Sequence, residues 1–213
     1  MPTWDALFHN EEFRWKEPHE QVIQFVDRFS PKRPARILDL GCGAGRHVVY
    51  LAAQGFQMVG LDNSPTALSL TRDWLDRTGL SARLVCADMT RPGFPSNSFD
   101  GLISIFVLYH NRLAAIRQTI EEIHRLLKPG GMALVSFASK RSYRYADGDS
   151  IEADTFVARG GPDSGELHHF SDLEEINRLL HAFRIQRIEL CEERGDQAEL
   201  HSHWQVFFQK PSF

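Results

Sequence analysis

The sequence predicts an α/β fold in which parallel strands alternate with helices. A short apolar run, 35–40, breaks into alternating glycines and continues into an apolar segment, 46–53, typical of a strand, a tight turn and a helix. This rhythm of strand and helix repeats as far as residue 137. Near the end, the apolar segments 184–190 and 203–209 suit a terminal hairpin. With 213 residues, 42% of them hydrophobic, we expect one domain, 1–213, with its own core.

The first strand and its turn carry the strongest functional signal. Residues 37–45 read Ile-Leu-Asp-Leu-Gly-Cys-Gly-Ala-Gly. Glycine reaches positive φ and has no side chain, so the backbone of such a turn can lie directly against a ligand. A dinucleotide-binding turn would have glycine where Arg46 stands. The carboxylate of Asp39 would repel a pyrophosphate but suit an ammonium or a sulfonium. The turn therefore predicts a site for a cationic nucleotide.

Two further predicted strands also end in acids. The segment 57–62 ends in Asp62, and the segment 82–87 is followed by Asp88. A carboxylate at the end of the second strand can accept hydrogen bonds from both ribose hydroxyls of an adenosine. Asp88 alone could be a turn-forming aspartate. Acids at the ends of three neighbouring strands favour a ligand role for each of them.

These segments resemble the class I S-adenosylmethionine (SAM)-dependent methyltransferases. Their first motif, apolar-apolar-Asp-x-Gly-x-Gly-x-Gly, is matched at 37–45. Phe99 and Asp100 before the apolar segment 101–110, and Leu-Leu-Lys-Pro-Gly-Gly at 126–131, are further points of resemblance. The resemblance, clear from about 35 to 137, implies a doubly wound, Rossmann-like sheet of seven mostly parallel strands with the last strand antiparallel. It also implies SAM as cofactor and methyl transfer as the reaction.

The resemblance assigns a set of cofactor-binding residues along these strand ends. Asp39, Gly41, Cys42 and Gly43 would shape the methionine pocket, Asp62 and Asn63 would lie at the ribose, Asp88 and Met89 at the adenine, and Phe106 near the methionine end.

Histidines are the candidate catalytic bases. Methyl transfer from a sulfonium depends mainly on alignment, and it needs a base only where the nucleophile carries a proton. His110 follows the fourth predicted strand and His169 ends a long polar segment, so both are assigned to the acceptor. Each could instead be a satisfied or surface histidine. A metal site made of His168, His169, His201 and His203 is an alternative. No cysteine or aspartate spacing supports that site, so no metal is expected.

Two segments fall outside the strand and helix rhythm. Residues 1–34 are expected to form a helical leader whose aromatic side chains either cover an edge of the sheet or close over the site as a lid. Residues 138–170 are expected to be an insertion that forms part of the substrate site. Its arginines and tyrosines could bind an anionic or aromatic acceptor, or the arginines could pair with nearby acids.

Charge and cysteine content narrow the partners and the compartment. A net charge of -4 makes nucleic acid an unlikely partner. We find no membrane-spanning segment and no signal peptide, and Cys42, Cys86 and Cys191 suggest neither disulfides nor a zinc site. A cytoplasmic location is therefore expected, while the oligomeric state is not predicted.

The leading hypothesis is a SAM-dependent methyltransferase with a small-molecule acceptor. The alternatives are a nicotinamide-dependent oxidoreductase, disfavoured by Arg46 and Asp39, and a non-catalytic SAM-binding protein.

Overall fold

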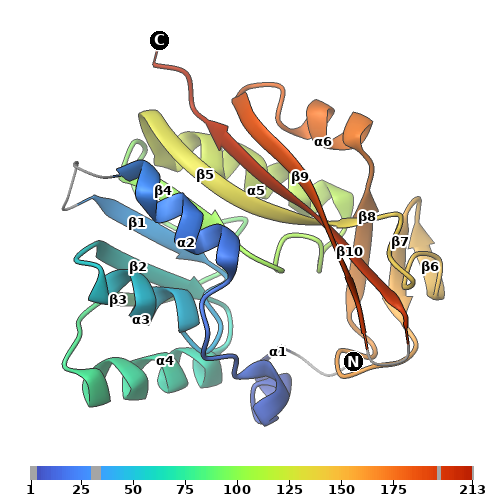
Figure 1. Ribbon diagram of the computed structural model, residues 1–213, viewed down its shortest axis with the longest axis horizontal. Coiled ribbons are helices and arrows are strands. Elements are labelled where there is room, and N and C mark those ends of the chain that lie inside the picture. Colours follow the sequence, from blue (N-terminus) through green and yellow to red (C-terminus); the bar gives the residue numbers. More distant parts are fainter. Residues whose placement is uncertain (1–3, 30–34, 196–197, 213) are drawn as a thin grey trace.

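The computed structural model describes residues 4–29, 35–195 and 198–212, which form one twisted sheet covered by helices (Figure 1). Its main strands follow the order β3-β2-β1-β4-β5-β10-β9, and β10 is antiparallel to both of its neighbours. This arrangement confirms the predicted α/β sheet with a reversed last strand. The bounds are β1 Arg36–Leu40, β2 Gln57–Asp62, β3 Arg83–Cys86, β4 Phe99–Ser104, β5 Leu127–Ser139, β9 Arg184–Arg194 and β10 Leu200–Gln209.

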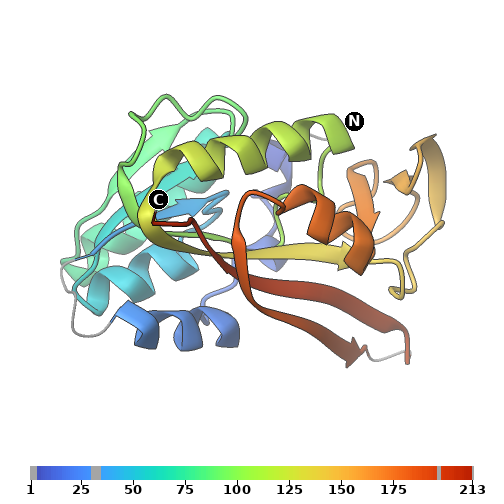
Figure 2. The same ribbon diagram turned by 90° about the horizontal axis from the view of Figure 1, so that it is seen from above.

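Alternation along the strands builds two cores, one on each face of the sheet. In β1, Ile37 packs in one core and Leu38 in the other, because successive side chains point to opposite faces. The Ile37 core is covered by α2 (Glu20–Val26), α3 (Arg46–Ala53) and α4 (Pro65–Thr78). The Leu38 core is covered by α5 (Leu113–Leu126) and α6 (Leu173–Leu179). Figure 2 shows α2 and α5 on opposite sides of the sheet.

Local signals explain where the helices begin and end. The Ser64 hydroxyl accepts a hydrogen bond from the Ala67 N–H at 3.0 Å, and Pro65 opens α4, as the sequence predicts. Gly79 then ends α4 in the left-handed conformation. The sequence Ser171-Asp172-Leu173-Glu174 suits a capping box with Ser171 as the N-cap of α6, but Ser171 is the last residue of β8. The carboxylate of Asp172 instead accepts the Glu175 N–H at 2.9 Å.

β4 ends near its predicted position, whereas β5 begins earlier than expected. β4 stops at Ser104, and the residues from 106 to 110, which the family resemblance places after the strand, form a loop. Phe106 adopts a φ of 61° in this loop, which a strand cannot accommodate. β5 begins at Leu127, so the Lys-Pro-Gly-Gly turn expected before the strand lies within it, as an irregularity opposite β4.

The leader and the insertion flank the main sheet. The described part of the leader contains α1 (Trp4–Leu7), η1 (Glu11–Phe13), α2 and η2 (Asp27–Phe29), while residues 1–3 and 30–34 lie outside the described residues. The insertion forms β6 (Gly148–Glu152), β7 (Thr155–Ala158) and β8 (Leu167–Ser171), and β8 joins the end of β5 (Figure 1). Among the described residues, no helix has both the length and the apolar character that crossing a membrane requires.

Candidate active site

A cavity of about 690 Å³ lies at the carboxyl ends of β1, β2, β3 and β4. Ligands bind at this edge in open parallel sheets because the loops after the strands converge there. The leader, the insertion and β10 supply the opposite walls. Of the residues assigned from the sequence, the following line the cavity: Gly41, Cys42, Gly43, Asp62, Asn63, Asp88, Met89, Phe106 and His110.

The turn after β1 is held close to β2 and admits no side chain at Gly41. The N–H groups of Gly41 and Cys42 both donate to the Leu61 carbonyl, at 2.7 and 2.9 Å. Gly41 has a φ of 79°, and a Cβ placed there would lie 2.4 Å from a methyl group of Val107. Gly45 has a φ of 91° and begins α3. The turn therefore presents bare backbone to the cavity.

Asp62 ties the glycine turn to the end of β2. Its Oδ2 accepts the Gly43 N–H at 2.8 Å, and its Oδ1 accepts the Ser64 N–H at 2.9 Å. Burial raises the pKa of Asp62, and these backbone hydrogen bonds partly oppose the rise. Because each carboxylate oxygen has more than one acceptor direction, Asp62 can hold the turn and still accept hydrogen bonds from a ligand.

Asp88 occupies the corresponding place after β3 but is exposed. One of its oxygens accepts both the N–H and the hydroxyl of Thr90, at 2.7 and 2.8 Å. This is the turn-forming role that the sequence left open. The second carboxylate oxygen is not used in these bonds, and Met89 beside it also lines the cavity. Asp88 can therefore form the turn with one oxygen and bind a ligand with the other.

Asp39 lies beneath the cavity, outside its wall. Its side chain is only 1% exposed, and burial raises its pKa from 3.8 to about 8, while Arg46 acts in the opposite direction. One oxygen has no hydrogen-bond partner, and it lies 3.9 Å from Nδ1 of His47. Nε2 of His47 accepts the His19 N–H, so the ring proton is on Nδ1 and faces Asp39. Direct contact of Asp39 with the cofactor remains a prediction.

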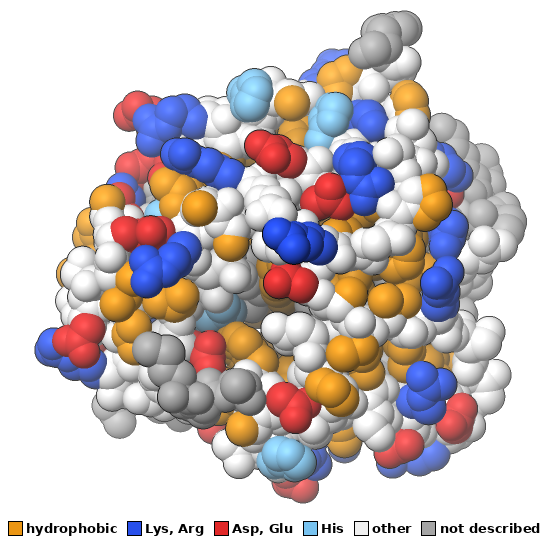
Figure 3. Space-filling view, turned by 180° about the vertical axis from the view of Figure 1, so that it is seen from behind, with side chains coloured by type: hydrophobic (Ala, Val, Ile, Leu, Met, Phe, Trp, Pro, Cys, Tyr) orange, Lys and Arg blue, Asp and Glu red, His pale blue; other side chains and the backbone are white. Residues whose placement is uncertain are grey.

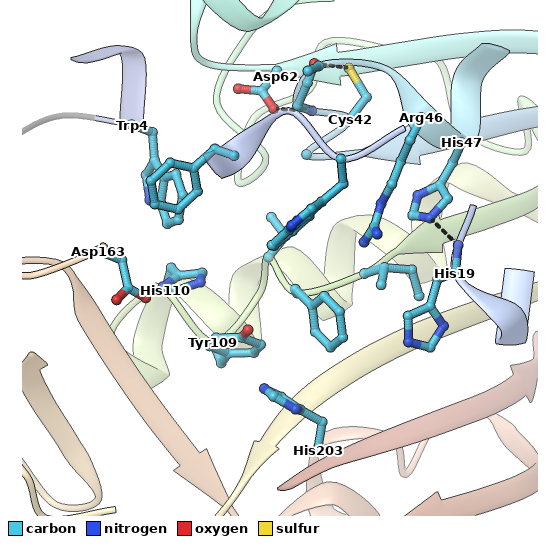
Figure 4. A pocket seen from close by; sticks show the side chains of 18 of the residues that line it. Trp4, His19, Cys42, Arg46, His47, Asp62, Tyr109, His110, Asp163 and His203 are labelled. Atoms are coloured by element: carbon cyan, nitrogen blue, oxygen red, sulfur yellow. Dashed lines mark hydrogen bonds between the residues drawn. The ribbon is translucent and has the colours of Figure 1, made fainter. Parts of the chain in front are cut away.

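Arg46 brings a positive charge into the cavity wall. Its guanidinium carbon lies 4.7 Å from the ring centroid of Trp15 and 6.0 Å from that of Phe106 (Figure 4). Within the described part of the chain, no carboxylate lies within ion-pair distance of this guanidinium, and burial lowers its pKa. From the sequence, Arg46 was used only as evidence against a dinucleotide-binding turn, which has glycine at that position. The structure shows that its guanidinium could also bind an anionic group of a ligand.

His110 and His203 face the cavity near Tyr109 (Figure 4). Nδ1 of His110 lies 3.1 Å from the Leu167 carbonyl, which can only accept, so Nδ1 carries the proton and Nε2 is free to accept one. Burial lowers the pKa of His110 well below 6.5 and that of His203 to about 4. Both rings are therefore neutral at pH 7, as a proton acceptor must be.

His169 is not part of the cavity, and its assignment to the acceptor is corrected. The ring is 1% exposed, with Nδ1 2.7 Å from the Thr155 hydroxyl and Nε2 2.8 Å from a Glu175 oxygen. Both nitrogens are therefore occupied, and the ring joins β7, β8 and α6. The arginines of the insertion do not line the cavity and pair with acids: Arg141 with Glu192, Arg144 with Asp163 and Arg159 with Asp149.

The leader covers the cavity and is fastened to α4. Oδ1 of Asp5 accepts the Ser64 hydroxyl at 2.7 Å and the Thr66 N–H at 2.8 Å, and the Ser64 bond is the main cause of the lowered pKa of Asp5. Next to it stand the leader's aromatic side chains that line the cavity: Trp4, Phe8, Phe13 and Trp15. The aromatic residues thus lie over the glycine turn, at the position that the lid hypothesis requires.

Comparison with known proteins identifies the family. Residues 37–131 match the family model of a methyltransferase domain. This segment is a methyltransferase domain of the class I SAM-dependent type. A structure of a SAM-dependent methyltransferase from Methanosarcina mazei is similar to this methyltransferase with a TM-score of 0.77 and 22% identity, covering 92% of this chain and 99% of that one. That likeness confirms the Rossmann-like methyltransferase fold.

Curated relatives have diverse acceptors. A demethylmenaquinone methyltransferase from Thermus thermophilus is 32% identical over 140 residues, which are 63% of this chain and 60% of the relative. A ribosomal RNA small subunit methyltransferase C from Alcanivorax borkumensis is 30% identical over 126 residues, 56% of this chain and 37% of the relative. The chain thus spans between about a third and three fifths of the length of such relatives.

Proposed function

We propose that this methyltransferase binds SAM in the described cavity and transfers its methyl group to a small-molecule nucleophile. One observation carries the proposal: a bare glycine turn, Asp62 and the Arg46 guanidinium, which pairs with no carboxylate among the described residues, surround a cavity of about 690 Å³. That volume is typical of sites for small ligands. A ligand with an adenosine, a cationic sulfonium and a carboxylate would engage all three features.

Each end of the cavity would hold one part of the cofactor. Asp62 would accept the ribose hydroxyls, and Asp88 with the Met89 backbone would bind the adenine. The methionine carboxylate would pair with Arg46, which can offer two parallel N–H groups to it. The backbone of Gly41 would approach the ligand closely because no Cβ intervenes.

The residues around the acceptor would align it and exclude water. When bound, SAM supplies a methyl carbon that the adjacent sulfonium makes electrophilic. The rings of Trp4 and Phe8 would keep water from this carbon, and alignment of two reactants can contribute about 7 to 11 kcal/mol. Where the acceptor atom carries a proton, Nε2 of His110 would take it, a contribution of about 10² to 10⁴ in rate.

We favour a small molecule over a nucleic acid as the acceptor. The leader covers the cavity with aromatic side chains, which leaves a small space suited to a compact acceptor. The net charge is -4, and on the face shown in Figure 3 basic and acidic side chains are interspersed. Phosphate binding instead depends on clustered basic residues. The RNA-methylating relative keeps nucleic acid as the competing hypothesis to be tested.

We also propose a cytoplasmic location. The cysteines Cys42, Cys86 and Cys191 are all free, as suits a reducing compartment. Fractionation of cells that produce the protein, with probes for each compartment, tests this proposal.

Binding measurements separate the cofactor hypotheses. Titration calorimetry is expected to show SAM binding and no NADH binding. Asp62→Ala is expected to weaken SAM binding at least about tenfold, or 1.4 kcal/mol, since it loses the ribose contacts. Asp73→Ala, an exposed position on α4, is the matched control. Binding of NADH in place of SAM would contradict the proposal.

A product assay separates the acceptor hypotheses. The protein is incubated with SAM and, in separate reactions, with phenols, quinols, thiols, amines or transcribed RNA, and S-adenosylhomocysteine is measured. Release with a small molecule and not with RNA is expected. Release with RNA alone would overturn the acceptor class. SAM binding without release in any reaction would favour the non-catalytic alternative.

A further inference from the structure

We propose that His110, Asp163 and His168 bind a divalent transition-metal ion at the edge of the cavity. Each residue offers one ligand atom, and the three atoms lie within 4.8 Å of one another. Two of the residues, His110 and Asp163, line the cavity, and Figure 4 shows their side chains beside each other at one end of it. The metal would therefore face the same space as the acceptor.

The three ligands come from separate segments that the fold brings together. His110 follows β4, Asp163 lies in the turn between β7 and β8, and His168 lies on β8. The rings of His110 and His168 are 4.6 Å apart between centroids and nearly perpendicular, at 87°. Perpendicular rings can direct a nitrogen each to one point from two directions, as a metal requires.

His110 is already oriented as a metal ligand. Its Nδ1 donates to the Leu167 carbonyl at 3.1 Å, so Nε2 bears a lone pair. Histidines that bind metals usually donate their other ring N–H to a carbonyl or carboxylate, which fixes the tautomer and the ring plane. The Leu167 carbonyl provides that support, and it precedes the second ligand, His168, in the chain.

His168 has a buried nitrogen without a hydrogen bond. Its side chain is 8% exposed, and Nε2 lies 2.9 Å from Oδ2 of Asp163. This ion-pair contact with Asp163 is the interaction that Nε2 makes among the described residues, and it does not meet the geometry of a hydrogen bond. Buried polar atoms in folded proteins nearly always have a partner. A metal ion between Nε2 and the carboxylate would satisfy both atoms at once.

Arg144 supports the carboxylate from the opposite side. Its guanidinium lies 2.5 Å from Oδ1 of Asp163, the oxygen that does not approach His168. In many metal sites, the carboxylate oxygen that does not bind the metal accepts a hydrogen bond from a neighbouring side chain. The ion pair with Arg144 therefore fixes the carboxylate while Oδ2 remains directed to the cluster.

The ligand chemistry selects the class of metal. Two imidazoles and one carboxylate suit Zn²⁺, Fe²⁺, Co²⁺ or Mn²⁺, whereas Mg²⁺ and Ca²⁺ prefer oxygen ligands throughout. Three protein ligands leave positions open for water or an acceptor oxygen, whose pKa a metal would lower. With the metal bound, Nε2 of His110 would be a ligand and would not take a proton, so the metal would favour loss of the acceptor proton by lowering its pKa. That role in acceptor binding rests on the proposed function, whereas metal binding itself does not.

The site replaces the histidine set considered from the sequence and departs from the expectation of no metal. His168 belongs to the cluster, but His169 is held by Thr155 and Glu175, and His201 lies near Glu199. The missing ligands were Asp163, which lies five residues before His168, and His110, which follows another strand. His110 was assigned to proton transfer alone, because its position in the chain does not place it beside His168.

The first test measures affinity for Zn²⁺. Protein without a histidine tag is stripped with a chelator and titrated with Zn²⁺ by calorimetry. One site per chain is expected, weakened at least tenfold by Asp163→Asn and by His168→Gln. His181→Gln, an exposed histidine bonded only to the Arg178 carbonyl, should leave the affinity unchanged. Equal Zn²⁺ affinity in all these variants would overturn the proposal.

The second test uses the wild-type protein and does not depend on the folding of variants. X-ray absorption of the Zn²⁺ complex should show two imidazole ligands with Zn–N distances of about 2.0 to 2.1 Å. A sulfur ligand, or a single imidazole, would overturn the proposed ligand set. SAM binding by the stripped protein is measured alongside. Zn²⁺ binding without SAM binding contradicts only the proposed function, and SAM binding without Zn²⁺ binding contradicts only the metal site.

Discussion

Arg46 is the residue whose role in the cavity is most open to a direct test. Its guanidinium has no ion-pair partner among the described residues. We expect Arg46→Met to weaken SAM binding by about 10- to 150-fold, because a hydrogen bond to a charged group contributes about 1.5 to 3 kcal/mol. Titration calorimetry measures the change.

A truncated ligand is the control for Arg46. 5′-Methylthioadenosine has the adenosine and sulfur of SAM but no amino-acid part, so Arg46→Met should bind it as tightly as the wild type does. If both ligands lose affinity equally, Arg46 supports the pocket and does not recognise the carboxylate.

Asp39 is expected to make stability depend on pH. Burial raises its pKa in the folded state to about 8, against 3.8 in the unfolded chain, so the folded protein binds more protons between these values. Stability should therefore fall as pH rises from about 4 to about 8. Asp39→Asn removes this contribution. The variant should gain about 3 kcal/mol relative to wild type between pH 5.5 and pH 8.5, a shift in Tm of about 6 to 12 °C.

Thermal unfolding at the two pH values measures this effect, with Asp73→Asn as an exposed control. An equal pH dependence of wild type and Asp39→Asn would show that Asp39 is ionised in the folded protein at neutral pH.

Site residues that directly follow a strand were predicted correctly from the sequence more often than site residues within a strand or in helices. Gly41, Asp62 and Asp88 were found because strand ends converge at one edge of a parallel sheet. Asp39 lies within β1, two positions after Ile37, so it shares the face of Ile37 and is buried under α3. His19 and His47 gave no signal, because only the folded chain brings the start of α2 to α3.

At the scale of elements, the carboxylate of Asp5 ties α1 to α4. Asp5 accepts hydrogen bonds from Ser64 and Thr66 at the start of α4. We expect Asp5→Ala to loosen the leader, so that limited proteolysis within residues 8–18 becomes several times faster. SAM should slow this cleavage in the wild type, if the leader closes over the ligand.

Mass spectrometry of the fragments measures the cleavage, and Asp73→Ala on α4 is the control. Cleavage that is the same in Asp5→Ala and wild type, with and without SAM, would leave the leader as a fixed cover and not a lid.

Helix ends were more predictable than the course of strands. Ser64, Pro65 and Gly79 bound α4 through local backbone chemistry, which a sequence reveals directly. β4 ends before Phe106, which takes a positive φ and whose N–H donates to the Ser136 hydroxyl at 2.5 Å. That partner lies on β5, so only the family resemblance, and not the apolar run 101–110 itself, indicated that Phe106 follows the strand. The sheet of the insertion was missed because its strands are short and β6 is mostly polar.

At the scale of the whole molecule, hydrophobic periodicity predicts strands and helices along the chain but not the order of the strands in the sheet. The family resemblance implied the reversed last strand, and the structure shows β10 between β5 and β9. The sheet then continues from β5 into β8, β7 and β6, which hold two of the proposed metal ligands near the cavity. The insertion therefore joins the site through side chains different from the arginines and tyrosines first considered.

Ligand binding should stabilise the entire fold, because the cavity is built from both halves of the sheet. Its walls come from the leader, the loops after β1 to β4, the insertion and β10, so a ligand there contacts distant parts of the chain. At a SAM concentration of about 100 times Kd, binding to the folded state alone adds about 2.7 kcal/mol. For a chain of this size the Tm should rise by about 5 to 11 °C. Differential scanning calorimetry measures the rise, with NADH as the control ligand. An equal rise with both ligands would indicate recognition of adenosine alone, since only SAM carries the carboxylate expected to pair with Arg46.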